Sequence, residues 1–211
     1  MIGARSFDEV NDLVANKRGI DFEEYFSTMD LSKGEKEKRV ELAKRLNDQF
    51  LVVVSLLFMA QKYSTNDYEL IRNQFVEMYK NAILGVIAID SYMSDYIEQI
   101  SHDVIESTLN NPDDPYYVSP DRAVFMAENE ANTCWNHQEF EDAIENGATK
   151  KQWIDIRDKR ERKTHIEVGG KIKPIQEPFA VGDSLLDYPK DTKYGADAKE
   201  IVNCRCSIRY F

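Results

Sequence analysis

Three side chains in the last third of the sequence have the chemistry of metal ligands. His165 is followed, about forty residues later, by the pair Cys204 and Cys206. Thiolate and imidazole groups suit Zn²⁺, and three protein ligands with one water match the open arrangement of a catalytic zinc site. However, the C-x-C spacing is not the common zinc spacing, and no fourth ligand is indicated. We expect no cofactor, and we expect Cys204 and Cys206 to be buried structural thiols beside a hydrogen-bonded His165. The two alternatives are a bound zinc ion and a regulatory or intersubunit thiol.

A second group of polar residues lies just before His165. If the segment is extended, Asp158, Arg160 and Arg162 fall on one face, because side chains alternate along a strand. An aspartate between two guanidinium groups forms a salt-bridged network that ties an irregular loop together; alternatively, one arginine stays free for a phosphate or a partner carboxylate. Residues 146–173 carry nine basic and four acidic side chains, enough for a few phosphate contacts. The candidate residues for binding nucleic acid or a partner are Lys151, Arg160, Arg162 and Lys163.

An enzymatic interpretation needs an acid, a base or a nucleophile in the same region. Glu128 and Glu130 cannot share one helical face, so the sequence does not indicate a catalytic acid/base pair of two carboxylates. We expect Glu130 to pair with an arginine. The motifs of common hydrolases, zincins and nucleotide-binding proteins are absent from the sequence. The alternative function is a metal-dependent hydrolase or nuclease, or a toxin-like effector, built on the His165 and cysteine cluster. Its candidate catalytic residues are Asp158, His165 and Glu130.

Composition and charge limit the class of protein. The chain has 211 residues, 42% of them hydrophobic, which is ordinary for a globular protein, and three cysteines, an odd number that suits a reducing compartment. Its net charge of −11 excludes a uniformly basic protein that binds nucleic acid over its whole surface. The acidity belongs to residues 1–149, whereas residues 150–211 carry 14 basic and 10 acidic side chains. The N-terminus lacks the pattern of a signal peptide, and the longest apolar run, residues 50–60, is too short to cross a bilayer.

The residues before position 120 have helical periodicity. Residues 34–63 contain no proline or internal glycine and predict one long helix. A second helix begins at about residue 66, and a third covers residues 90–109. Because the connections are short, we expect these helices to pack as an antiparallel bundle.

The pattern changes in the second half of the chain. A proline-rich loop at residues 110–120 precedes a helix that begins at Ser119-Pro120-Asp121 and ends at Asn146-Gly147. Short alternating segments then predict strands at residues 152–157, in two arms around Gly169-Gly170, and at residues 201–211, with an irregular segment at 176–199. The predicted fold class is α+β: an N-terminal antiparallel helical bundle followed by a small mixed α+β C-terminal domain with short strands.

The ordered series of residues in this second half resembles a known family. The residues that carry the resemblance are Ala127-x-x-Glu130, Lys151-x-Trp153, Asp158-x-Arg160-x-Arg162-x-x-His165, Gly169-Gly170, Glu177-Pro178-Phe179, Gly182, Tyr188-Pro189 and Asn203-Cys204-Arg205-Cys206. Their order and spacing are similar to those of the Mu protein F-like family of minor head, or head morphogenesis, proteins of tailed bacteriophages. The resemblance covers about residues 120–211.

The resemblance implies a structural role rather than an enzyme. Family members are associated with portal and capsid, enter during head assembly and are in some cases linked to DNA. We therefore expect residues 1–115 to dock to the portal or another partner and residues 116–211 to form the family domain. The expected partners are portal, capsid and scaffold proteins, with phage DNA at the basic C-terminal region and no membrane span. The expected location is the host bacterial cytoplasm during assembly and then the virion.

Overall fold

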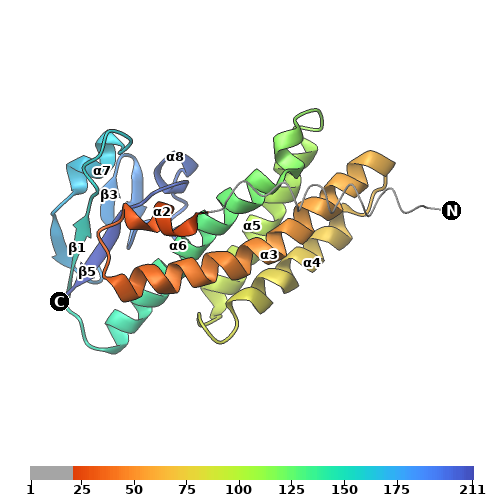
Figure 1. The fold of residues 1–211 in the computed structure, drawn as a ribbon. Coiled ribbons are helices and arrows are strands. Elements are labelled where there is room, and N and C mark those ends of the chain that lie inside the picture. Colours follow the sequence, from red (N-terminus) through yellow and green to blue (C-terminus); the bar gives the residue numbers. More distant parts are fainter. Residues whose placement is uncertain (1–20) are drawn as a thin grey trace. The chain divides into compact units, whose positions relative to one another are not determined.

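A computed structural model describes residues 21–211. The expectation that the N-terminus carries no signal peptide concerns residues outside this range. The described chain forms two compact units (Figure 1). Residues Leu42–Glu128 form a helical unit, and Glu23–Glu41 together with Asn129–Phe211 form a mixed unit. The predicted functional division between residues 115 and 116 stays a prediction.

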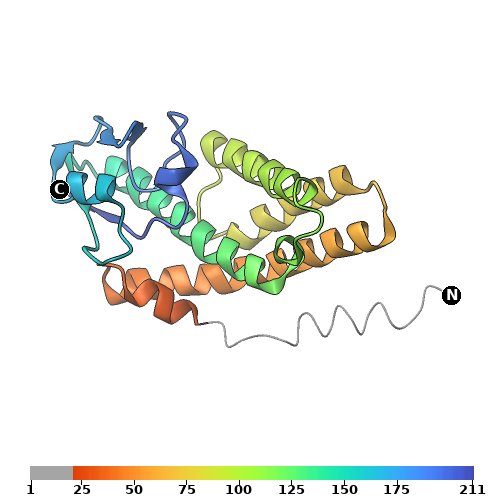
Figure 2. The ribbon, with the colours of Figure 1, turned by 90° about the horizontal axis from the view of Figure 1, so that it is seen from above.

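The helical unit is built from long amphipathic helices. It contains most of α3 (Lys33–Tyr63), followed by α4 (Tyr68–Ile83) and α5 (Ser91–Leu109), which run alongside one another in alternating directions (Figures 1 and 2). Phe50 of α3 meets Phe75 and Tyr79 of α4 edge to face, with ring centroids 5.2 and 5.4 Å apart. Such pairs add to the hydrophobic stabilisation of the core. The antiparallel bundle is thus confirmed, and among the described residues no helix has the length and hydropathy that crossing a membrane requires.

A buried arginine closes the helical unit at the start of α6 (Pro120–Glu145), just after the short 3₁₀ helix η1 (Pro115–Val118). Arg122 donates through Nη1 to the Thr108 hydroxyl at 2.6 Å and through Nη2 to the Val104 carbonyl at 3.1 Å. These acceptors lie in the last two turns of α5. The guanidinium therefore links the end of one helix to the beginning of the next.

In the mixed unit, the first turns of α3 lie against α6. The short helix α2 (Phe22–Ser27) precedes them. Arg39 is fully buried and donates two hydrogen bonds of 2.8 Å to Glu139, and further bonds of 3.1 Å to Asn132 and Asn136. A bidentate pairing of this kind uses the planar fork of arginine, which lysine lacks. One side chain of α3 thereby contacts three successive turns of α6.

The strands of the mixed unit form two small antiparallel sheets. In the first, β1 (Lys150–Ile154) is central, between β2 (Ile172–Pro174) and β5 (Ser207–Tyr210). In the second, β3 (Phe179–Val181) pairs with β4 (Ser184–Leu186). Two short helices, α7 (Lys163–Val168) and α8 (Ala198–Ile201), complete the unit. The predicted α+β fold class is confirmed.

Several local predictions were wrong. The first arm before Gly169-Gly170 is the helix α7, and residues 176–199 contain the β3–β4 hairpin. Residues 201–206 are not a strand, because α8 ends at Ile201 and β5 begins only at Ser207. Alternation over two or three residues does not distinguish a strand from one turn of helix, and tertiary contacts decide the outcome.

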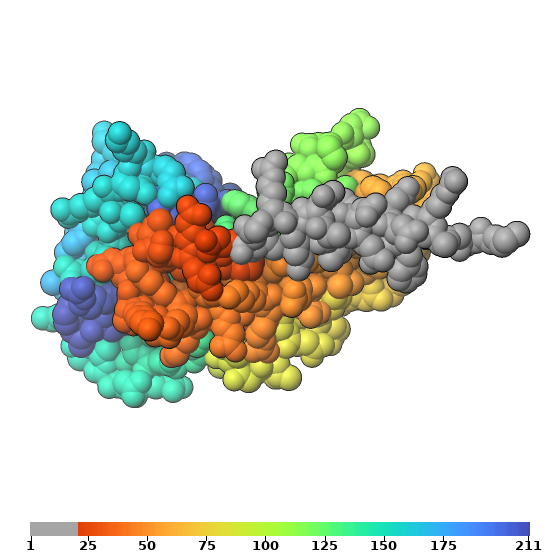
Figure 3. All heavy atoms as spheres, viewed as in Figure 1, coloured from red at the N-terminus to blue at the C-terminus, as the bar shows by residue number. Residues whose placement is uncertain are grey.

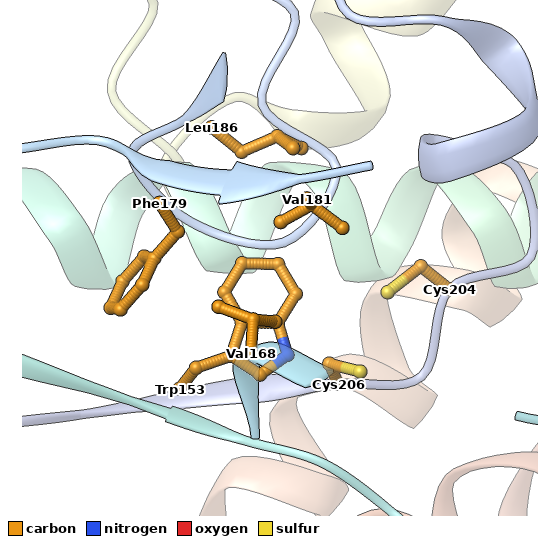
Figure 4. Packing of buried hydrophobic residues seen from close by; sticks show 7 residues of the cluster. All are labelled: Trp153, Val168, Phe179, Val181, Leu186, Cys204 and Cys206. Atoms are coloured by element: carbon orange, nitrogen blue, oxygen red, sulfur yellow. The ribbon is translucent and has the colours of Figure 1, made fainter. Parts of the chain in front are cut away.

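An apolar core joins the two small sheets. Its buried members are Trp153, Val168, Phe179, Val181, Leu186, Cys204 and Cys206 (Figure 4). Trp153 packs edge to face on Phe179, with ring centroids 5.4 Å apart. Cys206 lies beside the indole of Trp153, and Cys204 lies further from the ring (Figure 4). The fold thus brings both thiols into this apolar core.

Candidate functional site

The structure brings together the three residues predicted as metal ligands. His165 comes from α7, whereas Cys204 and Cys206 come from the segment between α8 and β5. Nδ1 of His165 lies 3.4 Å from the Sγ atom of each cysteine, and the three candidate ligand atoms lie within 4.8 Å of one another. All three side chains are buried, with 2% exposure each. The cluster is therefore an interior site.

Polar contacts hold the cysteine segment in place. The Asn203 backbone adopts a φ of 55°, and its N–H donates to Oδ1 of Asn129 on α6 at 2.9 Å. Asn132, one turn further along α6, donates to the Cys204 carbonyl at 3.1 Å. Asparagine tolerates the left-handed conformation better than most residues. Asn203 thus turns the chain just before the two cysteines, whose side chains are buried.

A buried carboxylate, Glu200 of α8, contacts the other nitrogen of His165. Oε2 of Glu200 lies 3.2 Å from Nε2 of His165 and accepts a hydrogen bond of 2.8 Å from the Thr164 hydroxyl. Gly182 leaves space for this carboxylate, since a Cβ atom there would lie 2.7 Å from Oε1 of Glu200. Neither Glu200 nor Thr164 was predicted, because no spacing rule links either residue to His165.

A buried lysine lies near the same cluster. Lys190 donates to Oδ1 of Asn129 and, at 3.3 Å, to the Ile201 carbonyl. Burial lowers its pKa to about 8, an effect that the negative charge of Glu130 partly opposes. Lys190 was also missed, since a single lysine in an irregular segment carries no sequence signal. The predicted pairing of Glu130 with an arginine stays a prediction.

The two thiols differ strongly in acidity. Hydrogen bonding from Cys206, aided by the bond to His165, holds the pKa of Cys204 well below its usual range despite burial. The same bond and burial raise the pKa of Cys206. Burial, the largest single effect, lowers the pKa of His165, but the hydrogen bond to Cys204 and the charges of Cys204 and Glu200 together outweigh it, and the net shift is upward. The Cys206 thiol thus donates to the more acidic Cys204, whose sulfur also contacts Nδ1 of His165.

The predicted network around Asp158 is only partly correct. Asp158 pairs with Arg205 at 2.6 Å and more loosely with Arg160 at 3.7 Å. Arg162 instead donates to the Val202 carbonyl at 2.5 Å. Residues 158–160 form a turn rather than a strand, so the three side chains do not share one face. The hydrogen bond from Arg205 lowers the pKa of Asp158 and keeps it ionised.

Lys151 does not belong to a surface site, contrary to the sequence prediction. Its side chain is fully buried and its ammonium lies 3.1 Å from Oδ1 of Asp187. The ammonium also lies 4.9 and 5.5 Å from the ring centroids of Phe140 and Phe179. A cation between aromatic faces and a carboxylate is a structural element of the core. We therefore remove Lys151 from the candidates for binding nucleic acid.

Other members of the sequence series also have roles in the fold. The Pro178 carbonyl accepts a hydrogen bond of 2.8 Å from Lys173, and the Pro189 carbonyl accepts one of 2.9 Å from Asn136. Gly170 adopts a φ of 77°, which favours glycine, in the turn between α7 and β2. These residues fix the loops that frame the cluster.

Comparison with known families identifies the chain. A family model described as Phage Mu protein F like protein matches residues 27–209. The chain therefore belongs to this family. The resemblance seen in the sequence was limited to about residues 120–211; the match extends over the N-terminal helices as well. No curated protein and no solved structure matches the chain.

Proposed function

We propose that this chain is a head morphogenesis protein, a minor structural component of the head of a tailed bacteriophage. The observation that carries the proposal is the family match over residues 27–209. In this proposal the helices contact portal, capsid or scaffold proteins. The protein is made in the bacterial cytoplasm and ends in the virion.

The burial of five of the family residues supports a structural role. Trp153, His165, Phe179, Cys204 and Cys206 are each at most 2% exposed. A reaction centre for a polymer substrate needs an approach from solvent, whereas residues that define a core do not. The series of residues therefore describes how the fold is held together.

The candidate catalytic residues of the alternative function each have a structural partner. Asp158 is bound by Arg205, Glu130 accepts a hydrogen bond of 2.8 Å from Asn129, and His165 lies between the thiols and Glu200. A hydrolase, a nuclease or a toxin-like effector would need one of these groups to reach a substrate. The geometry supports the structural role better.

The exposed basic side chains are candidates for contact with DNA or an acidic protein surface. Arg157, Arg160 and Lys163 have side-chain exposures of 75%, 72% and 90%. Arg157 and Arg160 belong to the segment between β1 and α7, and Lys163 is the first residue of α7. This part of the chain lies at the surface of the mixed unit, coloured cyan in Figure 3. Three such cations can displace counterions from a phosphate backbone and give binding that weakens steeply with salt.

A conditional phage mutant tests the proposed role. A nonsense codon in this gene should leave infectious yield intact in a suppressor host and reduce it at least tenfold in a non-suppressor host, with defective heads in electron micrographs. Antibody should detect the chain in purified wild-type virions. Normal yield in the non-suppressor host, together with absence of the chain from virions, would overturn the proposal. Arrest of bacterial growth by the chain expressed alone would support the effector alternative.

A further inference from the structure

We infer that His165, Cys204 and Cys206 bind a single Zn²⁺ ion that locks α7 to the C-terminal segment. The three candidate ligand atoms lie within 4.8 Å of one another, and no other group among the described residues combines three such atoms so closely. This inference is independent of the proposed function, because it depends only on the geometry of the mixed unit.

The two nitrogen–sulfur distances in the cluster are those of a coordination shell. With Zn–S bonds of about 2.3 Å and a Zn–N bond of about 2.0–2.1 Å, tetrahedral angles place a ligand nitrogen about 3.5 Å from each ligand sulfur. Nδ1 of His165 lies 3.4 Å from both sulfurs. A single N–H or lone pair forms a good hydrogen bond to one sulfur at a time. Equal distances from Nδ1 to both sulfurs therefore fit one metal ion bound by all three atoms better than they fit a hydrogen bond.

The far side of the imidazole is arranged as in many zinc proteins. Nε2 of His165 faces the buried carboxylate of Glu200 at 3.2 Å, and the Thr164 hydroxyl holds that carboxylate at 2.8 Å. A carboxylate in this position fixes the proton on Nε2 and directs the Nδ1 lone pair toward the metal. The imidazole tautomer that binds zinc is thus the one that the surroundings select.

A buried indole supplies an independent observation. Nε1 of Trp153 is buried and completes no hydrogen bond. The nitrogen faces Cys206 (Figure 4). A thiolate is a stronger acceptor than a thiol, so coordination of Cys206 would give this N–H a partner.

The donor set also selects the kind of metal. Two thiolates and one imidazole are soft and borderline ligands, which favour Zn²⁺ over Mg²⁺ or Ca²⁺. Three protein ligands leave a fourth position for water, and the carboxylate of Glu161 borders the site, with Oε1 3.5 Å from Sγ of Cys206. Backbone N–H groups of Ile156 and Arg157 hold this carboxylate at 3.2 and 2.5 Å.

Metal analysis of the full-length wild-type protein tests the inference. Chain purified without chelator should contain about one zinc ion per molecule by elemental analysis. After exchange into Co²⁺, it should show a near-ultraviolet thiolate-to-metal band and the intense visible bands of tetrahedral Co²⁺. Zn²⁺ should also slow alkylation of Cys204 and Cys206 at least tenfold by mass spectrometry, while Cys134, a buried cysteine on α6, serves as the internal control.

Two substitutions link the metal to these residues. Cys206→Ser should lose the Co²⁺ spectrum, whereas Cys134→Ser should keep it. If Cys206→Ser does not fold, the alkylation pattern of the wild-type chain decides the question. Less than 0.1 zinc per chain with no Co²⁺ band at millimolar Co²⁺, or equal alkylation of Cys204 and Cys206 with and without Zn²⁺, would overturn the inference.

Discussion

The carboxylate of Glu200 lies 3.2 Å from Nε2 of His165, and both side chains are buried in the mixed unit. Such an outer carboxylate tunes a histidine ligand, and its loss typically weakens metal binding 10–100-fold. We therefore expect Glu200→Gln to weaken Zn²⁺ affinity by that factor in a competition titration with a chromogenic chelator. Glu167→Gln, an exposed change on the same helix as His165, is the control and should leave affinity unchanged. Equal affinities of the two variants would contradict this role of Glu200.

Gly182 should tolerate alanine less well than a glycine with similar backbone geometry. Its φ is 58°, and an added Cβ would collide with the Glu200 carboxylate at 2.7 Å. Gly170 has a φ of 77° with nothing within 4 Å of an added Cβ, so Gly170→Ala measures backbone strain alone, about 1–2 kcal/mol. Chemical denaturation should show a larger loss of unfolding free energy for Gly182→Ala than for Gly170→Ala. Equal losses would mean that Glu200 moves aside freely.

Arg39 should be among the most sensitive positions for stability. Replacement by methionine removes four hydrogen bonds to α6 and leaves Glu139 without its partner. Breaking a buried ion pair in this way costs about 3–5 kcal/mol. Arg39→Lys should also lose stability, because an ammonium cannot reproduce the bidentate contact. Urea unfolding monitored by circular dichroism measures both, and a loss below about 1 kcal/mol for Arg39→Met would contradict the prediction.

The start of α3 should contribute stability that depends on pH. Glu35 accepts a hydrogen bond from the Ser32 N–H at 2.7 Å, and the Ser32 hydroxyl accepts one from the Glu35 N–H at 3.3 Å, which is a capping box. Burial alone would raise the pKa of Glu35, but the bonds with Ser32 and the charges of Arg39 and Lys38 lower it overall. Ser32→Ala should cost about 0.5–2 kcal/mol at pH 7.

The sign of this pH effect follows from the lowered pKa. The stabilisation is complete above the ordinary pKa of 4.5 and is lost as the pH falls through the lower, folded-state pKa. The difference in unfolding free energy between wild type and Glu35→Gln should therefore shrink as the pH falls from 7 to 3. A difference that grows toward acid pH would show that the carboxylate does not stabilise the helix.

Contact with DNA can be tested with two matched lysines. Lys163 and Lys33 are both 90% exposed and each pairs with a glutamate four residues later. Only Lys163 lies in the basic segment before His165, so Lys163→Gln should weaken filter binding of duplex DNA at low salt, whereas Lys33→Gln should not. Each lost phosphate contact lowers the slope of log affinity against log salt by about 0.9. If the two substitutions change DNA affinity equally, Lys163 makes no specific contact with DNA.

Helices with long periodic patterns were predictable from the sequence. The boundaries of α3, α5 and α6 agree with the sequence prediction within about two residues, because capping residues such as Asp90 and Ser119 mark their starts. The side chain of Asp90 accepts from the Met93 N–H, and Ser119 accepts from the Arg122 N–H. Gly147, with a φ of 80°, ends α6 as predicted. Local signals were sufficient in these cases.

The short elements and the partners of His165 were not predictable in this way. The β3–β4 hairpin has three residues in each strand, too few for a periodic signal. Glu200, Lys190 and Thr164 reach the cluster through tertiary packing, and their spacing in the sequence follows no motif. The sequence placed Lys151 in a basic segment, but its burial beside Asp187 depends on how β1 packs. Charge along the chain therefore does not distinguish a surface cation from a buried one.

The edges of the three-stranded sheet β2-β1-β5 matter for a protein that would be surrounded by many copies of other subunits. Both of its outer strands are short, and β2 ends at Pro174, which has no N–H to donate to another chain. At the other edge, the Ser207 hydroxyl of β5 donates to the Asp30 carbonyl at 3.2 Å, in the turn before α3. Neither edge offers a long template for an added strand. The sheet is thus protected against edge-to-edge aggregation in a crowded assembly.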